Sequence, residues 1–203
     1  VTRERDAIIA VGIFSEEEID EMILSSPNII FLNNNQNDTI FDRMFIDYDT
    51  PVKRCFDYLK ENGARRIAFL NGLNEEDGIR IGYRRTEGVK SVMKEEGVYN
   101  EDLFLLGDLT DNSGREMMRK AISLGADAVV LGTQLIENGV LEEYEKSEKK
   151  PILVLRRDID LDYKKTKYPV VRMCSEQLWE ITNLLIYSRL KRPAPPLKVY
   201  IQA

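Results

Sequence analysis

The sequence predicts an α/β fold in which parallel sheets are flanked by helices on both faces. Short β-branched runs alternate with amphipathic helical stretches along nearly the whole chain, which gives six or seven βα repeats. Hydrophobic residues make up 43% of the 203 residues and charged residues 32%, the ordinary balance of a globular protein with a sizeable core. Strands buried on both faces read as nearly continuous apolar runs, and that is the character of these segments.

The predicted strands are short aliphatic runs bounded by glycine, proline, asparagine or charged residues. In chain order they are AIIAVG (7–12), NIIFLN (28–33), RMFID (43–47), RRIAFLNG (65–72), LFLLG (103–107), DAVVLG (127–132), PILVL (151–155), PVVRM (169–173) and, after the turn RPAPP, LKVYIQ (197–202). Open α/β sheets bind ligands outside the carboxyl ends of their strands, so the residues at these ends are the first candidates for a site.

The predicted helices lie between these strands and begin at recognisable caps. Ser15, with Glu18 three residues later, forms a capping-box signature for the first helix. Pro51 lies in the first turn of the second helix, and Gly63 follows its end. The apolar stripes of the helices are, in chain order, Ile19, Met22 and Ile23; Val52, Cys55, Phe56 and Leu59; Met117, Met118, Ala121 and Ile122; Leu135, Val140, Leu141 and Tyr144; and Leu178, Trp179, Ile181 and Leu185.

One further helix, predicted over YRRTEGVKSVMKEEG, carries an arginine on its apolar side. Arg85 precedes Val89 by four residues and Val92 by seven, so all three share one helix face. Gly88 on that side costs about 1 kcal/mol against alanine in a helix interior, and a close approach at this position is expected. A buried guanidinium needs a carboxylate or a polar ligand, because it can hardly lose its charge. Either a pair with Asp108 or Glu87, or contact with a ligand, would satisfy it.

Composition and charge exclude several classes of function. The net charge of −6 and a pI near 5.0 argue against a nucleic-acid-binding surface on these residues, since such a surface is basic. The absence of histidine excludes Ser-His-Asp triads and histidine-ligated metals, and no GxGxxG or Walker-type loop follows a strand. Cys55 and Cys174 lack metal-ligand spacing and are interpreted as reduced core thiols of a cytosolic protein. No metal or cofactor, no membrane helix and no secretory signal are therefore expected.

Polar side chains gather at or just past the predicted strand ends. The set comprises Asn33, Asn34, Asn35, Phe45, Asp47, Leu109, Thr110, Thr133, Gln134, Arg156, Arg157, Asp158, Arg172 and Met173. Its amides, hydroxyls and arginines suit hydrogen bonding to a polyhydroxy ligand. Simpler interpretations remain open: a turn at Asn33–Asn35, a solvent-exposed pair at Arg156–Arg157, and a helix cap or turn at Asp47 and at Asp158. A glycosidase needs two facing carboxylates, and because these two aspartates are the only obvious candidates, an enzyme is not expected.

Five ordered segments resemble the effector-binding core of the lactose/galactose-repressor (LacI/GalR) family of bacterial transcription regulators. DAIIAVG resembles that family's DGIIxxG, and FDYLKENGARRIAFLNG resembles xxxLxxxGHRRIAxxxG, with Ala64 at the usual histidine. RTEGVKSVMKEEGV is similar to RxxGFxxALxxxGI, GDLTDNSG to GDFTxxSG, and GADAVVLGTQLIENGVL to xPDAIxxxxDxxAxGxL. The spacing within each segment agrees, and the resemblance covers nearly the whole chain.

The resemblance implies a two-lobed, periplasmic-binding-protein-like (type I) fold with a sugar in the cleft between the lobes. The first lobe would comprise residues 1–47 and about 174–196, and the second residues 48–172 and about 197–203. The family's DNA-binding headpiece, hinge helix and first βα units have no counterpart in this sequence, because Val1 aligns just before the third strand. An incomplete first lobe, with an exposed sheet edge that invites a partner, is therefore expected.

The resemblance also implies roles for individual residues. Arg85 occupies the family position that holds sugar hydroxyls, which would make its guanidinium a bidentate clamp on the ligand. The other implied effector-binding residues are Asn33, Phe45, Leu109, Thr133, Arg157 and Met173. Asn33 and Arg157 stand where the family has aspartates, and Gln134 replaces another. This exchange favours an effector with an acidic or phosphate group, or else a loss of effector response.

The expected function is therefore effector sensing by the dimerising core of a transcription repressor. Its partners would be a sugar or sugar phosphate, a second copy of the chain, and operator DNA bound through a headpiece not in this chain. The helices after GDLTDNSG and DAVVLG are expected to form the dimer face. A transport-type sugar-binding protein of the same fold is the alternative.

Overall fold

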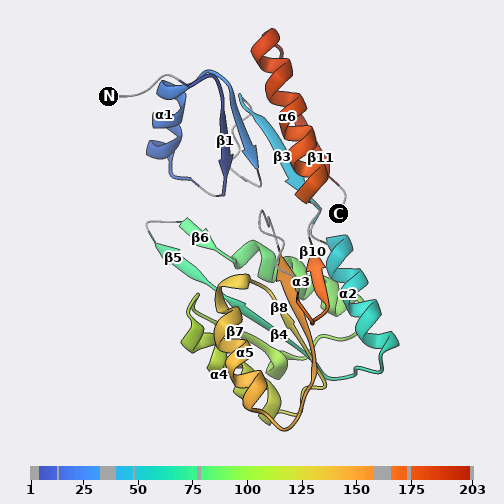
Figure 1. The fold of residues 1–203 in the computed structure, drawn as a ribbon. Coiled ribbons are helices and arrows are strands. Elements are labelled where there is room, and N and C mark those ends of the chain that lie inside the picture. Colours follow the sequence, from blue (N-terminus) through green and yellow to red (C-terminus); the bar gives the residue numbers. More distant parts are fainter. Residues whose placement is uncertain are drawn as a thin grey trace. The chain divides into compact units, whose positions relative to one another are not determined.

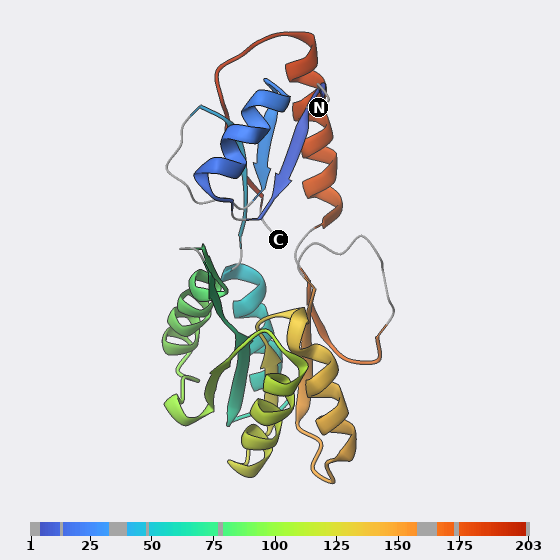
Figure 2. The same cartoon turned by 90° about the vertical axis from the view of Figure 1, so that its left-hand side faces the viewer.

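The computed structural model describes residues 5–12, 14–32, 40–47, 49–76, 79–157, 166–172 and 175–201. The chain divides into two compact units, one formed by residues 1–47 with 174–203 and the other by residues 48–173. Each unit has its own parallel sheet, so each is described separately. Figure 1 and Figure 2 show their ribbons from two directions at right angles.

The first unit is a four-stranded parallel sheet with helices on opposite faces. Its elements are β1 (Ile8–Val11), α1 (Glu16–Ser25), β2 (Ile29–Leu32), β3 (Asp42–Ile46), α6 (Ser175–Lys191) and β11 (Lys198–Ile201), and the strand order is β1-β2-β3-β11. Ile19 of α1 packs with Ala10 and Phe31 on one face. Thr182 of α6 donates to Met44 Sδ, whose strand partner Leu32 follows Phe31 and so points to the opposite face.

The closing strand belongs to this first unit, and its expected place in the second lobe was wrong. β11 pairs in parallel with β3, which sets Tyr200 beside Phe45 with ring centroids 5.1 Å apart. The turn before β11 is fixed by Asp42, whose carboxylate accepts from Leu197 N at 2.8 Å and pairs with Arg189 at 2.6 Å. The apolar sequence of β11 would fit the edge of either sheet. The contacts of Asp42 with Leu197 and Arg189 hold it beside β3.

The second unit is a five-stranded parallel sheet in the order β10-β9-β8-β4-β7. Its elements are α2 (Asp49–Glu61), β4 (Ile67–Gly72), α3 (Tyr83–Glu95), β7 (Phe104–Gly107), α4 (Asp111–Ser123), β8 (Ala128–Leu131), α5 (Glu137–Lys146), β9 (Ile152–Arg157) and β10 (Val170–Arg172). Helices α4 and α5 pack on one face, through residues such as Met118 and Val140 against Leu70 and Leu131. Helices α2 and α3 cover the other face, where Val52 and Val89 approach Phe69.

Most predicted elements are confirmed within a residue or two. The capping box of α1 is present, with Ser15 Oγ accepting from Glu18 N at 3.2 Å and Glu18 Oε2 accepting from Ser15 N at 2.7 Å. The stripe of α2 is buried as predicted, and Gly63 follows α2 at φ +85°. The antiparallel hairpin of β5 (Asn74–Glu76) and β6 (Ile79–Ile81) and the 3-10 helix η1 (Glu101–Leu103) were not predicted.

Three local predictions were wrong. Ile23, expected on the apolar stripe of α1, is 42% exposed. Leu135 does not lie on the buried stripe of α5: it belongs to a separate 3-10 turn, η2 (Gln134–Ile136), and is 59% exposed. Gly88 does not accommodate a close approach, because the nearest atom to a Cβ at this position is Asp49 Oδ1 at 3.5 Å, an ordinary contact. Next to Leu135, Ile136, also in η2, is fully buried in its place.

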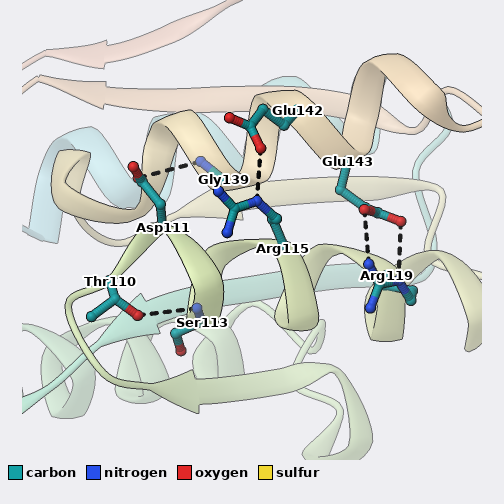
Figure 3. A network of polar contacts seen from close by, with 8 residues as sticks. All are labelled: Thr110, Asp111, Ser113, Arg115, Arg119, Gly139, Glu142 and Glu143. Atoms are coloured by element: carbon teal, nitrogen blue, oxygen red, sulfur yellow. Dashed lines mark hydrogen bonds and ion pairs between the residues drawn. The ribbon is translucent and has the colours of Figure 1, made fainter.

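Helices α4 and α5 approach each other at glycines and are linked by ion pairs along their length (Figure 3). A Cβ at Gly114 would lie 2.4 Å from the carbonyl oxygen of Ile136, so only glycine fits there. Arg115 Nε donates to Glu142 Oε2 at 2.7 Å, and Arg119 Nη2 donates to Glu143 Oε2 at 3.0 Å. None of the helices described in either unit is long and apolar enough to cross a bilayer.

Candidate functional site

Four of the predicted site residues lie at the carboxyl edge of the second unit's sheet. Because all five strands are parallel, Gly72, Gly107, Leu131 and Arg157 end their strands at the same edge. Leu109 follows β7, Thr133 follows β8, Arg157 closes β9, and Arg85 lies in the first turn of α3. The sheet thus brings together side chains that are up to 72 positions apart in the sequence, from Arg85 to Arg157.

Arg85 is half-buried and reaches across to the neighbouring strand end. Its Nη1 donates a hydrogen bond to the carbonyl oxygen of Gly132, directly after β8, at 2.9 Å. Helix α3 can start at this point because Gly82, its N-cap residue, adopts φ +85°, a conformation that favours glycine. The predicted inward direction of Arg85 is therefore confirmed, and its guanidinium lies beside the strand end rather than on the outer face of α3.

Asn71 is a site residue that the sequence analysis missed. It is fully buried at the end of β4, and its Nδ2 donates to Thr86 Oγ1 at 2.8 Å, while Thr86 Oγ1 donates to Gly82 O at 2.8 Å. Among the described residues, Asn71 Oδ1 has no hydrogen-bond partner; it lies against Gly132, where a Cβ would be 2.6 Å away. An asparagine inside the apolar run IAFLNG was the signal available in the sequence.

Thr133 and Leu109 both lie at this edge of the sheet, where each contacts a neighbouring part of the chain. Thr133 is buried, and its Oγ1 accepts from Leu135 N at 3.4 Å, so it caps η2. Leu109 packs over Gly72, since its Cδ2 would lie 2.6 Å from a Cβ there. Leu109 therefore covers Gly72 with an apolar side chain, whereas Thr133 acts as a helix cap in this structure.

Arg156 and Arg157 are buried, and their interpretation as a solvent-exposed pair was wrong. They are 2% and 6% exposed, on opposite faces of β9. Arg157 forms a two-pronged ion pair with Glu137, the first residue of α5, in which Nη2 donates to Oε1 at 2.7 Å and Nη1 to Oε2. Arg156 faces Cys55, whose burial raises the pKa of the thiol to about 12 although the positive charge of Arg156 lowers it.

The other predicted effector-binding residues either belong to the first unit or lie outside the described residues. Phe45 belongs to β3 of the first unit, where it stacks on Tyr200. Asn33 and Met173 lie outside the described residues, as does Asp158. Chemically, the edge offers guanidinium, amide and carbonyl groups for hydrogen bonding, and no nucleophile paired with a base appears among its described residues.

The curated proteins that the sequence matches are transcription regulators. The HTH-type transcriptional repressor MelR of Bacillus subtilis is 22% identical over 153 residues, which are 72% of this chain and 44% of the relative. Catabolite control protein A of Priestia megaterium is 27% identical over 141 residues, 64% of this chain and 42% of the relative. The chain spans less than half the length of these curated relatives. No family model matches the sequence.

Solved structures share the fold along almost the whole chain. The transcriptional regulator CelR in complex with cellobiose superposes with a TM-score of 0.72 at 19% identity, covering 97% of this chain and 63% of that one. A LacI-family regulator from Enterococcus faecium with bound ribose also gives 0.72, at 18% identity over 97% of this chain and 76% of that one. The α/β, periplasmic-binding-protein-like fold is thus confirmed, as is the resemblance to regulators of this type.

Proposed function

We propose that this chain is the effector-sensing and dimerising core of a bacterial transcription repressor of the LacI/GalR type. The effector would be a sugar or a sugar phosphate, and Arg85 would bind its hydroxyls. The observation that carries this proposal is the Arg85 guanidinium at the carboxyl edge of the sheet, 2.9 Å from Gly132 O, where open α/β sheets bind their ligands. The matched relatives are transcription regulators, which supports a regulator rather than a transport-type protein or an enzyme.

Effector binding would change the DNA affinity by shifting the populations of the protein's conformations. A ligand that binds one conformation better shifts the protein toward it, and a coupling of about 1–3 kcal/mol changes a second affinity by roughly 5- to 150-fold. The DNA would be held by a headpiece outside these 203 residues, because the chain itself carries a net charge of −6. A repressor works where its operator lies, so the proposal includes a cytoplasmic location.

The proposed dimer face is the outer surface of helices α4 and α5. These two helices are locked together at their glycines and by the pairs Arg115–Glu142 and Arg119–Glu143 (Figure 3), so they form a rigid surface. Arg119 is 62% exposed and Glu142 52% exposed, which leaves charged side chains of both signs available to a second copy. Sedimentation analysis of Arg119→Glu beside the native chain tests this face, with weaker self-association expected for the variant.

The sugar-binding proposal is tested by titration calorimetry with a panel of neutral sugars and sugar phosphates. Arg85→Ala is expected to lose the heat signal of the sugar that the native chain binds. The matched control is Arg80→Ala, because Arg80 lies five residues earlier, is 57% exposed, and contacts Glu75 and the Tyr83 ring rather than the sheet edge. Circular dichroism checks that each variant is folded. Identical sugar signals for the native chain and a folded Arg85→Ala would refute the proposal.

A further inference from the structure

We infer that Glu137 is a specificity-determining residue of this site: it neutralises Arg157 and so makes the sheet edge select uncharged sugars over sugar phosphates and sugar acids. The inference rests on the proposed function and narrows its effector class. It reverses the expectation from sequence that an arginine in place of an aspartate favours an anionic effector. That expectation considered Arg157 without the partner that the fold provides.

Arg157 and Glu137 form a bidentate ion pair. Arg157 Nη2 donates to Glu137 Oε1 at 2.7 Å and Nη1 donates to Oε2, so both carboxylate oxygens are engaged by the two terminal nitrogens. The same Nη1 also donates to the carbonyl oxygen of Arg156 at 2.9 Å. Two-pronged contact of this kind is how arginine recognises carboxylates and phosphates. Glu137 therefore occupies the guanidinium surface that an anionic group of an effector would need.

Burial strengthens the attraction between Glu137 and Arg157. The side chain of Arg157 is 8% exposed and that of Glu137 is 13% exposed, so water screens their attraction poorly. Both partners are also fixed by the backbone, because Arg157 is the last residue of β9 and Glu137 is the first of α5, where the helix dipole favours a carboxylate. We therefore expect the Arg157–Glu137 ion pair to remain intact in the absence of a ligand.

An anionic effector at this edge meets two penalties that a neutral sugar does not. A phosphate group carries about −1.5 to −2 charges near pH 7, and it would approach a carboxylate held at the same guanidinium. It would have to displace Glu137 or bind beside it, and either choice places two anions close together in a poorly solvated site. A neutral hydroxyl accepts or donates beside the intact pair without this repulsion.

The test measures binding of inorganic phosphate by calorimetry and by thermal melts in phosphate and chloride buffers of equal ionic strength. The native chain is expected to show no phosphate-specific signal. Glu137→Gln keeps the size of the side chain but removes its charge, and is expected to bind phosphate about tenfold or more tightly than the native chain. Glu137→Gln with Arg157→Gln is expected to lose this gain. Glu145→Gln, on the same helix α5 but paired with Lys167, is the matched control and is expected to behave like the native chain.

Glu137→Gln leaves a buried cation without its carboxylate, so its folding is monitored in both buffers. A variant that melts cooperatively only in phosphate supports the inference, because phosphate then replaces the missing carboxylate. If the variant folds in neither buffer, Glu137→Asp takes its place; it withdraws the carboxylate by one methylene and is expected to gain a smaller phosphate response. Equal phosphate responses of the native chain and the folded variant overturn the inference.

The outcomes separate this inference from the proposed function. A native chain that binds a neutral sugar through Arg85, with no phosphate gain in the Glu137 variants, overturns the inference alone. A chain that binds no sugar, yet gains phosphate binding in Glu137→Gln, overturns the proposed function while the charge relationship between Glu137 and Arg157 stands.

Discussion

The backbone of Gly139 in α5 lies directly against the carbonyl oxygen of Asp111 in α4: a Cβ on Gly139 would be 1.7 Å from that oxygen. Gly139 N also faces the Asp111 side chain, with Oδ1 at 3.4 Å (Figure 3). The two helices are thus in backbone contact at this point, and a side chain of any size would force them apart. Because α5 also carries Glu137, this contact sets the position of the site's carboxylate.

Replacing Gly139 with alanine is therefore expected to destabilise the second unit. Inserting a methyl group into a packed contact typically costs about 1–3 kcal/mol, and the obstacle here is backbone, which cannot rotate away. Urea denaturation followed by circular dichroism measures the change. Gly88→Ala is the matched control, since Gly88 is also inside a helix but has its nearest neighbour at 3.5 Å. Alanine there is expected to be neutral or to stabilise by about 0.5–1 kcal/mol; equal destabilisation of both variants would contradict the contact at Gly139.

Breaking the Asp42–Arg189 pair is expected to unfold the first unit more easily. Arg189 Nε donates to Asp42 Oδ2 at 2.6 Å and Nη2 to Oδ1 at 2.7 Å, with side chains only 9% and 6% exposed. This contact raises the pKa of Arg189. Removing one partner of a buried pair costs about 3–5 kcal/mol because the other charge is left uncompensated, so Asp42→Ala should lower the free energy of unfolding by that amount.

Trp179, the single tryptophan of the chain, lies on α6 and reports this unit by its fluorescence during urea titration. Lys191→Ala is the control on the same helix: Lys191 is exposed and its Nζ lies 4.1 Å from the centroid of the Tyr187 ring, a contact worth about 0.5–1 kcal/mol at the surface. Superimposable fluorescence transitions of Asp42→Ala and the native chain would show that the pair contributes little.

Cys55 is expected to resist thiol reagents in the folded protein. Burial raises its pKa to about 12, so almost no thiolate is present at pH 8, whereas an unfolded cysteine has a pKa of about 8.5. A Cys174→Ser variant isolates Cys55 for timed alkylation with iodoacetamide and mass spectrometry. Labelling should be negligible without denaturant and rapid in concentrated urea. Fast labelling of the native variant would show that α2 opens readily from the sheet.

Glu145 is expected to remain ionised far into the acid range. Its carboxylate accepts from the Tyr168 hydroxyl at 2.6 Å and from Lys167 Nζ at 2.9 Å, and these contacts lower its pKa from 4.5 to about 2. Since the folded pKa is lower than the unfolded one, the ionised form stabilises the fold above about pH 4.5, and this stabilisation is lost as the pH falls toward 2.

An NMR titration of the Glu145 carboxyl carbon measures this midpoint. Tyr168→Phe removes the hydroxyl, the largest of the causes, and should move the midpoint back toward 4.5. Lys167→Gln should move it in the same direction, since the lysine contributes both a hydrogen bond and its positive charge. A midpoint that does not respond to Tyr168→Phe would mean that the hydroxyl is not the carboxylate's main partner in solution.

The site was only partly predictable, and individual residues show why. Arg85 was recognisable because helical periodicity alone puts it on the inward face of α3. Asn71 was visible as a polar residue in an apolar strand, yet its contacts with Thr86 and Gly132 depend on the return of α3 and β8 to the same edge. Glu137 was not recognisable, because it is 20 residues from Arg157 and reads as an ordinary acidic residue in the first turn of a helix.

The α/β class, the capped helices, the burial of most positions in their stripes and the family resemblance could be predicted from the sequence, since all of these follow from local periodicity, cap chemistry and motif spacing. The sheet that β11 joins and the charged partner of Arg157 could be seen only in the folded structure. Both depend on contacts between residues far apart in the chain: Asp42 with Arg189 over 147 positions, and Glu137 with Arg157 across two elements. Periodicity describes which face of an element is buried, but it carries no information about the partner on the other side.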